Sequence, residues 1–382
     1  MRITFLEPYP APPGERAIGG PRYRDEAVVD GLRRRGHSVQ AFTSTLGSDE
    51  VRDDSFGFPW SFLGVGAVDR RLHPSTWINR KMVNAVVRSN PDLLLVRAVG
   101  TATAREVHRR CSVPSAVILG GVSRTTSILE HDLLLTETAA QERYFRLRVG
   151  GRRLLRLPKL PAAEFLAAIA PRMPERSLDV VLVSSFKPHK NLGALIPVFQ
   201  YPLRIRVLGD GPERAEIERA AHGCRADVHF LGEVHPRHVA QVVAESRLLL
   251  HPSRSEGFPR AIAEAMSVGT PSVALRGVVG DPIRDGVNGI LCKESELADT
   301  VMQLTRDLPR LQQLSTAARA TFDMEFSPDR LELSIEELED RMCELVQRSR
   351  IATRIDRGVR QARRSYWAAE SMLRRQLRAG RG

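Results

Sequence analysis

Short apolar runs alternate with helix-like segments along the chain, and the alternation occurs twice. In the first half, helices are expected over 24–35 and 77–88, and strands at 3–6, 39–42, 93–96, 115–119 and 133–135. After a basic, proline-containing stretch at 152–174, strands are expected again at 180–183, 204–208, 228–231, 247–251 and 272–275. Strands that alternate with helices favour a doubly wound, largely parallel sheet. Two such units in tandem predict an α/β protein with a cleft where the carboxyl ends of the two sheets face each other.

This pattern divides the chain into four parts. Residues 1–160 are predicted to form a first Rossmann-like domain, and residues 161–326 a second. The segment 327–347 has the pattern of a final amphipathic helix, and 348–382 is a basic amphipathic tail. A length of 382 residues exceeds one ordinary hydrophobic core, so more than one domain is expected on size alone.

The formal net charge of +12 is concentrated in the tail. Residues 348–382 contain eleven arginines and two acidic residues, which is 11 − 2 = +9, so the rest of the protein is nearly balanced. Aromatic residues make up 5% of the chain and no nucleic-acid-binding module is recognisable, which argues against a nucleic-acid partner. Apolar residues of the tail recur at steps of three, four or seven: Ile351, Ile355, Val359, Ala362, Tyr366, Leu373 and Leu377. One helical face is therefore predicted either to bind an anionic membrane surface or to pack on the protein's own body or a second subunit.

Three absences in the sequence narrow the class of protein. No run of about 18 apolar residues occurs, and a strand-like segment follows Met1 directly, so neither a transmembrane helix nor a secretory peptide is visible. The four cysteines, Cys111, Cys224, Cys292 and Cys343, are scattered without a C-x2-C pair, which is typical of reduced intracellular thiols. There is no D-x-D motif, so nothing calls for a metal-bound diphosphate. We expect a cytoplasmic protein, peripheral on the inner membrane face if the tail binds lipid.

The stretch 255–264, Ser-Glu-Gly-Phe-Pro-Arg-Ala-Ile-Ala-Glu, carries the most specific candidate chemistry. Proline suits the first helical position, so a helix is predicted from about Pro259 through Met266. Glu256 then lies in the loop before the helix, and Glu264 lies on its second turn, roughly 12 Å further along at about 1.5 Å per residue. Loop amides and the helix N-terminus would favour a phosphate between the two carboxylates. A glycosyl nucleotide diphosphate has that layout of sugar, phosphates and ribose.

Residues 251–292 resemble the signature region of the family 4 glycosyltransferases, retaining enzymes of the GT-B fold, and the resemblance extends to most of the chain. It implies two Rossmann-like domains facing across a cleft, with the helix at 327–347 crossing back to the first. It also implies transfer of a hexosyl unit from a UDP- or GDP-sugar to a hydroxyl of a sugar, lipid-linked or small-molecule acceptor, in glycan, glycolipid or glycoconjugate biosynthesis. The nucleotide-sugar is a co-substrate, and neither a cofactor nor a metal is implied.

The same resemblance implies roles for individual residues. Lys190 and Glu256 would be the catalytic residues, at the donor phosphates and the donor sugar, and Glu264 would accept hydrogen bonds from ribose hydroxyls. The other implied donor-binding residues lie in loops after predicted strands: Gly19, Gly20, Lys187, Gly232, Val234, Gly257 and Phe258. The Gly-Asp-Gly-Pro sequence at 209–212 is interpreted as a tight turn before a helix at 213–221 rather than as a donor contact.

The sequence departs from the family pattern at two places. Gly120 stands where the family often has a histidine facing the donor sugar, and Ser184 and Ser185 stand where an arginine commonly precedes the phosphate lysine. Lys187 is expected to replace that arginine electrostatically, although an ammonium lacks the bidentate fork of a guanidinium. Two alternatives therefore stay open: a catalytically inactive nucleotide-sugar-binding scaffold or partner subunit, and a sugar-nucleotide epimerase of the GT-B fold.

Overall fold

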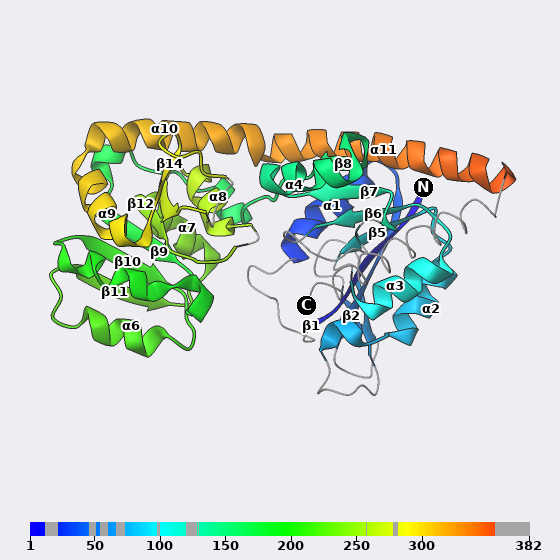
Figure 1. Ribbon diagram of the computed structural model, residues 1–382, viewed down its shortest axis with the longest axis horizontal. Coiled ribbons are helices and arrows are strands. Elements are labelled where there is room, and N and C mark those ends of the chain that lie inside the picture. Colours follow the sequence, from blue (N-terminus) through cyan, green and yellow to red (C-terminus); the bar gives the residue numbers. More distant parts are fainter. Residues whose placement is uncertain are drawn as a thin grey trace, which may run out of the picture. The chain divides into compact units, whose positions relative to one another are not determined.

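The computed structural model of the protein describes residues 1–11, 22–45, 51–53, 60–65, 73–97, 100–119, 128, 130–256, 258–277 and 282–355. The chain divides into two compact units, and each is built around one sheet (Figure 1). Unit 1 comprises residues 1–137, 141–157 and 332–382, and unit 2 comprises 138–140 and 158–331.

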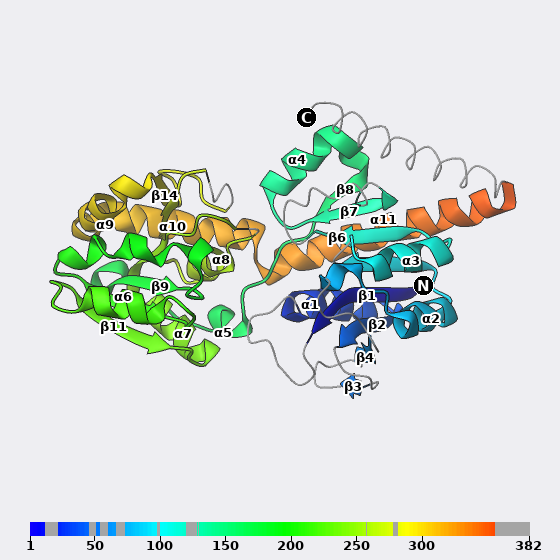
Figure 2. The ribbon, with the colours of Figure 1, turned by 60° about the horizontal axis from the view of Figure 1, so that its bottom comes forward.

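The sheet of unit 1 has the strand order β3-β4-β2-β1-β5-β6-β7-β8, which can be followed in Figure 2. Its strands are β1 (Arg2–Ala11), β2 (Ser38–Thr45), β3 (Val51–Asp53), β4 (Trp60–Gly64), β5 (Leu93–Arg97), β6 (Ser115–Ile118), β7 (Leu133–Thr136) and β8 (Leu154–Arg156). Among the described strands, β3 and β4 are antiparallel and the other neighbours are parallel. Strands β5, β6 and β7 are buried along their whole length, as expected for parallel strands covered on both faces.

Helices cover both faces of this sheet: α1 (Arg22–Arg34), α2 (Arg80–Ser89), α3 (Ala102–Arg110), α4 (Ala139–Val149) and α11 (Pro328–Ile355). Helices α2 and α3 lie together on one face (Figure 1). There Met82, Val86 and Val107 join Leu94 and Val96 of β5 in one buried cluster. Helices α2 and α3 therefore pack on this face of the sheet through buried apolar side chains.

The sheet of unit 2 has the order β11-β10-β9-β12-β13-β14, and all of its described neighbours are parallel. Its strands are β9 (Leu178–Val183), β10 (Arg204–Leu208), β11 (Asp227–Gly232), β12 (Ser246–His251), β13 (Ser272–Leu275) and β14 (Gly289–Cys292). Its helices are α5 (Ala163–Leu166), α6 (Arg214–Ala221), α7 (Pro236–Ala244), α8 (Arg260–Ser267), α9 (Leu297–Arg306) and α10 (Leu308–Glu325).

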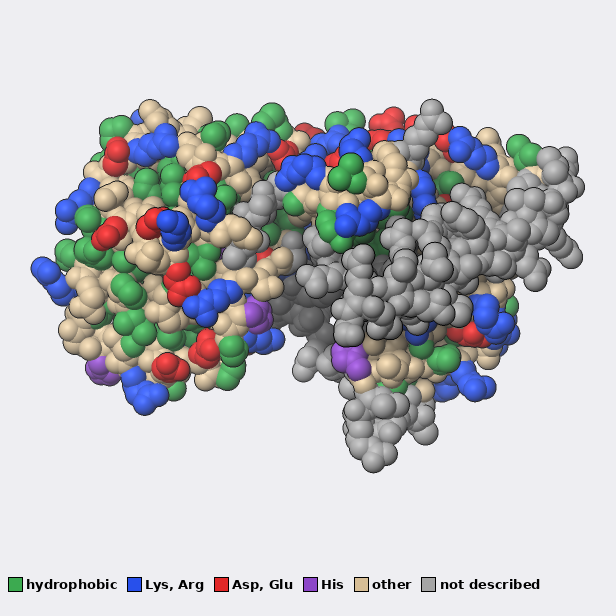
Figure 3. All heavy atoms as spheres, viewed as in Figure 1, with side chains coloured by type: hydrophobic (Ala, Val, Ile, Leu, Met, Phe, Trp, Pro, Cys, Tyr) green, Lys and Arg blue, Asp and Glu red, His purple; other side chains and the backbone are tan. Residues whose placement is uncertain are grey.

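Two apolar clusters fill the two faces of this second sheet. One gathers α6 and α9 with residues such as Phe186 and Phe199 from the connection between β9 and β10. The other gathers α7, α8 and α10 around Val181 and Leu249 of the central strands. On the face of unit 2 seen in Figure 3, basic and acidic side chains are interspersed and do not form a patch of one sign.

Helix α11 returns the chain to unit 1 and is longer than the predicted segment 327–347. Ser327 caps its first turn, accepting the amide of Arg330 at 3.2 Å, and a proline occupies the first helical position. The helix then runs to Ile355, past the predicted end. Its buried side chains recur at helical spacing: Leu331, Ile335, Leu338, Met342 and Val346. Burial of this stripe stabilises the packing of the helix by roughly 25 cal/mol per Å² of apolar surface removed from water.

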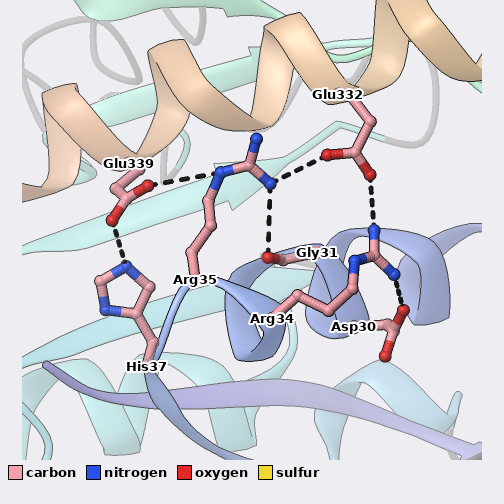
Figure 4. Close-up of polar contacts among 7 residues, drawn as sticks. All are labelled: Asp30, Gly31, Arg34, Arg35, His37, Glu332 and Glu339. Carbon is pink, nitrogen blue, oxygen red and sulfur yellow. Dashed lines mark hydrogen bonds and ion pairs between the residues drawn. The ribbon is translucent and has the colours of Figure 1, made fainter.

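Polar contacts join the end of α1 to the unit 1 part of α11 (Figure 4). Glu332 accepts from Arg34 Nη2 at 2.5 Å and from Arg35 Nη1 at 2.9 Å, and the arginines lower the pKa of its carboxyl. Glu339 accepts from His37 Nε2 at 2.9 Å and pairs with Arg35 Nε at 3.4 Å. Because solvent-exposed ion pairs are worth about 0–1 kcal/mol each, the pair between Arg34 and Glu332, whose side chains are 55% and 43% exposed, adds little to the stability of the unit.

Several predicted features lie outside the described residues. These are Gly19, Gly20, Gly120, Gly257 and residues 356–382. The roles assigned to the glycines, and the hypothesis that the tail binds a membrane, therefore stay predictions. Among the helices that the structure does describe, none has the length and apolar content needed to cross a bilayer.

Close packing of α1 against α11 makes the first testable prediction. A Cβ added at Gly31 would lie 2.6 Å from Ile335 Cδ1, so Gly31→Ala forces this buried side chain to move, which is expected to offset the better helix propensity of alanine. Ile335→Val removes that Cδ1 atom and restores room. In urea unfolding, the double variant should be more stable than the sum of the single changes by about 1 kcal/mol.

Gly193→Ala serves as the control, because an added Cβ there meets no atom within 4 Å. It should combine additively with Ile335→Val. Strict additivity of Gly31→Ala and Ile335→Val as well would contradict the described contact between the two helices.

Candidate functional site

The candidate site lies at the centre of the unit 2 sheet, where the strand order reverses. The order runs outward from the β9–β12 pair, in which Val180 lies beside Leu248 and Val181 beside Leu249. In open parallel sheets, ligands bind outside the carboxyl ends of the two strands at such a reversal. The loop after β9 carries Lys190 and the loop after β12 carries Glu256. The sheet itself therefore brings the two predicted catalytic residues together.

Hydrogen bonds tie the two loops to each other. Asn191 Nδ2 donates to the Pro252 carbonyl at 3.2 Å, and Ser253 Oγ donates to the His189 carbonyl at 3.2 Å. Asn191 has a φ of 54° and ends the short 3-10 turn that carries Lys190. Asparagine tolerates this left-handed conformation better than most residues. These hydrogen bonds hold Lys190 beside the start of the loop that carries Glu256.

Two donors meet at one carboxylate oxygen of Glu256. Lys190 Nζ lies 2.7 Å from Glu256 Oε1, and His251 Nε2 lies 3.0 Å from the same atom. The side chains of Glu256 and His251 are only 10% and 7% exposed. Burial alone would raise the pKa of Glu256, but the hydrogen bonds from His251 and Lys190 outweigh it and lower the pKa to about 2. The carboxylate is therefore ionised throughout the neutral range.

His251 is a site residue that the sequence analysis did not single out. It is the last residue of β12 and lies five positions before Glu256. A titratable side chain at the carboxyl end of a buried central strand was the available signal, because such ends form ligand sites in α/β sheets. The pairing of Lys190 with Glu256 was not expected either, since the two residues had been assigned to different parts of a ligand.

Glu264 has the opposite electrostatic environment. It lies on α8, which begins at Arg260 directly after Pro259, close to the predicted start. The side chain is 8% exposed, and Arg260 Nε lies 3.2 Å from Glu264 Oε1. Desolvation dominates and raises the pKa of Glu264 to about 7, although Arg260 and the amide of Ala162 oppose the shift. At neutral pH this carboxyl exists in both protonation states.

The remaining predicted residues of unit 2 are placed as follows. Lys187 is exposed at the start of the turn that carries Lys190. The ring of Phe258 packs 5.7 Å from the ring of Phe326, measured between centroids, and half-buried Val234 joins the same apolar cluster. Gly232 is buried at the end of β11 with a φ of 69°.

The glycines of the 209–212 turn have structural reasons for their identity. Gly209 has a φ of 114°, and a Cβ there would lie 1.8 Å from the Ser184 carbonyl oxygen. Gly211 has a φ of 150°, and its Cβ would lie 2.8 Å from the Phe186 carbonyl oxygen. The amide of Phe186 in turn donates to the Asp210 carbonyl at 2.8 Å. Only glycine permits this close approach of the loops after β9 and β10.

Within the described residues, no group of three or more acidic, histidine or cysteine side chains is placed to hold a metal ion. Cys111, Cys224, Cys292 and Cys343 are all free thiols.

The chain is similar to several known proteins. Residues 177–307 match the family described as glycosyl transferases group 1. The chain is 25% identical over 193 residues to the phosphatidylinositol N-acetylglucosaminyltransferase gpi3 subunit of Schizosaccharomyces pombe, covering 48% of this chain and 42% of that protein. It is 26% identical over 163 residues to the N-acetyl-alpha-D-glucosaminyl L-malate synthase of Bacillus anthracis, covering 40% and 42%. The matches thus span about two fifths of these curated relatives' length.

Similar solved structures cover nearly the whole chain. Sucrose-phosphate synthase from Thermosynechococcus elongatus has a TM-score of 0.70 at 16% identity, over 90% of this chain and 99% of that one. Anabaena HepE in complex with UDP and glucose has a TM-score of 0.66 at 19% identity, over 89% and 99%. The predicted fold class is confirmed: the chain has the GT-B fold, with two Rossmann-like domains and a C-terminal helix.

The second prediction follows from the raised pKa of Glu264 and concerns the dependence of stability on pH. Because its folded-state pKa lies above the unfolded value, its contribution to stability is complete below about pH 4.5 and is lost as pH rises through 7. Glu264→Gln keeps an acceptor for the Ala162 amide but carries no charge to desolvate. Urea unfolding should show Glu264→Gln gaining on wild type between pH 5 and pH 8, by on the order of 3 kcal/mol at the upper end.

Glu233→Gln is the matched control, because Glu233 is exposed in the same unit. Its stability difference from wild type should not vary with pH in this window. A stability difference between Glu264→Gln and wild type that stays unchanged from pH 5 to pH 8 would contradict the desolvation argument.

Proposed function

We propose that this chain, whose residues 177–307 match the family described as glycosyl transferases group 1, is a retaining hexosyltransferase. It would move a sugar from a nucleotide diphosphate-sugar to an acceptor hydroxyl, in glycan, glycolipid or glycoconjugate biosynthesis. The observation that carries the proposal is the meeting of Lys190 and Glu256 at the strand-order reversal of unit 2, with Glu264 further along α8.

Lys190 is proposed to stabilise the leaving diphosphate. Its ammonium has three donors, one of which is engaged by Glu256 Oε1, and the side chain is 19% exposed. Negative charge builds on the diphosphate as the anomeric bond breaks, and a cation in a partly buried site stabilises that charge without a metal ion. The acceptor proton can pass to the departing phosphate oxygen, so a protein base is not required.

The two carboxylates are proposed to hold opposite ends of the donor. The ionised Glu256 would face the sugar, where a carboxylate accepts hydroxyl hydrogen bonds and stabilises positive charge developing at the anomeric carbon. Glu264 would accept the ribose hydroxyls. Hydrogen bonds to its charged form lower its pKa, so nucleotide binding is expected to release a proton near pH 7.

The similar proteins indicate which donors to test, but they do not indicate one acceptor class. The HepE structure contains UDP, so UDP-sugars are the first donors to test and GDP-sugars the second. One relative is named for phosphatidylinositol and another for L-malate, so relatives of this chain differ in acceptor. We propose a sugar, a lipid-linked molecule or a small molecule that offers a hydroxyl.

A second candidate is a nucleotide-sugar-binding scaffold without turnover. It is favoured by Gly120 and by Ser184 and Ser185, which stand where active relatives often carry a histidine and an arginine. Binding of a nucleotide without transfer to any acceptor would select this alternative. Interconversion of the donor sugar without transfer would select an epimerase.

The third prediction tests the proposed reaction. Nucleotides and their sugars are first screened by melting temperature, since a ligand that binds only the folded state raises it. The selected donor is then incubated with acceptor pools in the presence of EDTA, and NMR identifies the anomer of the fresh product. We expect transfer with the donor's anomeric configuration retained. An inverted product, or activity that EDTA abolishes and manganese restores, would contradict the proposal.

The fourth prediction separates the two catalytic roles. Lys190→Met should weaken the affinity for the free nucleoside diphosphate by about 1.5–3 kcal/mol, the usual cost of losing a charge-assisted hydrogen bond. Glu256→Gln should lower kcat severely while nucleotide affinity stays near wild type, because Glu256 is assigned to the sugar. Calorimetry and initial rates measure the two effects.

Lys293→Met is the control, since its lysine is 74% exposed in the same unit. It should alter neither quantity. If Glu256→Gln transfers sugar at the wild-type rate, Glu256 has no role in the reaction. If Lys190→Met binds the nucleoside diphosphate with wild-type affinity, the diphosphate does not bind at the loop that carries Lys190.

A further inference from the structure

The two donors at Glu256 Oε1 differ in how firmly the fold holds them. His251 ends a central strand, and its side chain is 7% exposed. Lys190 lies on a short turn, its side chain is 19% exposed, and four methylene groups separate its charge from the backbone. The histidine is thus the fixed partner of Glu256 and the lysine is the movable one.

A bound donor would change the balance between these partners. If Lys190 turns its ammonium toward the diphosphate, as the proposed function requires, Glu256 keeps only His251 among its two described partners. A buried carboxylate without a donor is strongly disfavoured, because desolvation is not compensated. Without His251, Glu256 would take up a proton or turn toward solvent at the moment its charge is needed.

We propose that His251 is a positioning residue that keeps Glu256 charged and aimed at the donor sugar after Lys190 has turned to the diphosphate. The proposal rests on the proposed function and deepens it by assigning a third residue to the same site. His251 itself touches neither sugar nor phosphate in this scheme. It acts through the 3.0 Å bond from Nε2 to Glu256 Oε1.

The bond fixes where the histidine carries its proton. A carboxylate only accepts hydrogen bonds, so Nε2 must be the protonated ring nitrogen whenever Glu256 is ionised. The amide nitrogen of a glutamine side chain can occupy about the same place and donate in the same direction. Leucine fills similar space and donates nothing. These two substitutions separate the hydrogen bond from the packing of the side chain.

The kinetic test compares His251→Gln, His251→Leu and the control His238→Leu, whose histidine is exposed on α7. His251→Leu should lower kcat by about 100-fold, the cost of misplacing a reacting group, while KM for the nucleotide-sugar stays unchanged. His251→Gln should recover most of kcat, and His238→Leu should match wild type. Equal rates in His251→Leu and wild type, or equal losses in the leucine and glutamine variants, would overturn the proposal.

An NMR test does not depend on turnover. In 15N-labelled protein, the His251 ring signals are assigned by their loss in His251→Gln, and two-bond 15N–1H correlations show which nitrogen carries the proton. We expect protonated Nε2 in the free protein, in the UDP-saturated protein and in Lys190→Met, which mimics the turned lysine. Loss of the Nε2 proton in Lys190→Met would overturn the proposal even if UDP does not bind.

Failure of the proposed function has a different signature. It would appear as a wild-type protein that neither binds nucleotides nor transfers sugar, while the histidine signals still report the His251–Glu256 bond.

Discussion

The parallel pairing of β9 with β12 is the constraint on which the rest of unit 2 depends. At the amino ends of these strands, buried Arg176 donates to the Ser246 carbonyl and to Thr270 Oγ1, both at 2.7 Å. Desolvation lowers the pKa of Arg176 to about 10, so the guanidinium still carries its charge at neutral pH. At the carboxyl ends, the same pairing sets Lys190 beside Glu256, 66 positions later in the chain. One structural arginine and one candidate site thus mark the two edges of the same strand pair.

Two glutamates eight positions apart illustrate how environment, and not residue type, decides chemistry. Both are largely buried, and desolvation opposes charge on both. Glu256 has two hydrogen-bonding partners that overcome the penalty, whereas Glu264 has one arginine and a backbone amide that do not. As a result, Glu256 is ionised throughout the neutral pH range, whereas Glu264 titrates at about pH 7. A donor with a polar sugar and a hydroxyl-bearing ribose suits such a pair.

The pattern of apolar residues predicted the central strands of both sheets but missed four short strands at or beside a sheet edge. The predicted strands fall within β1, β2, β5, β7 and β9 to β13, with β6 ending one residue early, because buried parallel strands are continuous runs of apolar residues. Strands β3, β8 and β14, which lie at sheet edges, and β4, which lies beside β3, were not predicted. Helix α11 extends beyond its predicted end at residue 347. In this added part Arg350 contacts unit 1 through an ion pair with Asp92 at 3.2 Å.

The family resemblance singled out Lys190, and the stretch 255–264 singled out Glu256 and Glu264, but neither predicted the electrostatic states of these side chains. The charge of Glu256 depends on His251, whose role is visible only when β12 and the following loop are in place. The pKa of Glu264 is raised by desolvation, and the Ala162 amide that partly offsets this shift lies about 100 positions earlier in the sequence. Such effects arise from tertiary contacts, so no local pattern encodes them.

A nucleotide-sugar is proposed to bind at the carboxyl edge of the β9–β12 pair. The decisive experiment is a crystal structure of the protein with a bound UDP- or GDP-sugar. We expect the diphosphate within hydrogen-bonding distance of Lys190 Nζ, the ribose on Glu264, and Glu256 still bonded to His251 while facing the sugar. A nucleotide bound elsewhere, with the Lys190–Glu256 pair undisturbed, would contradict it.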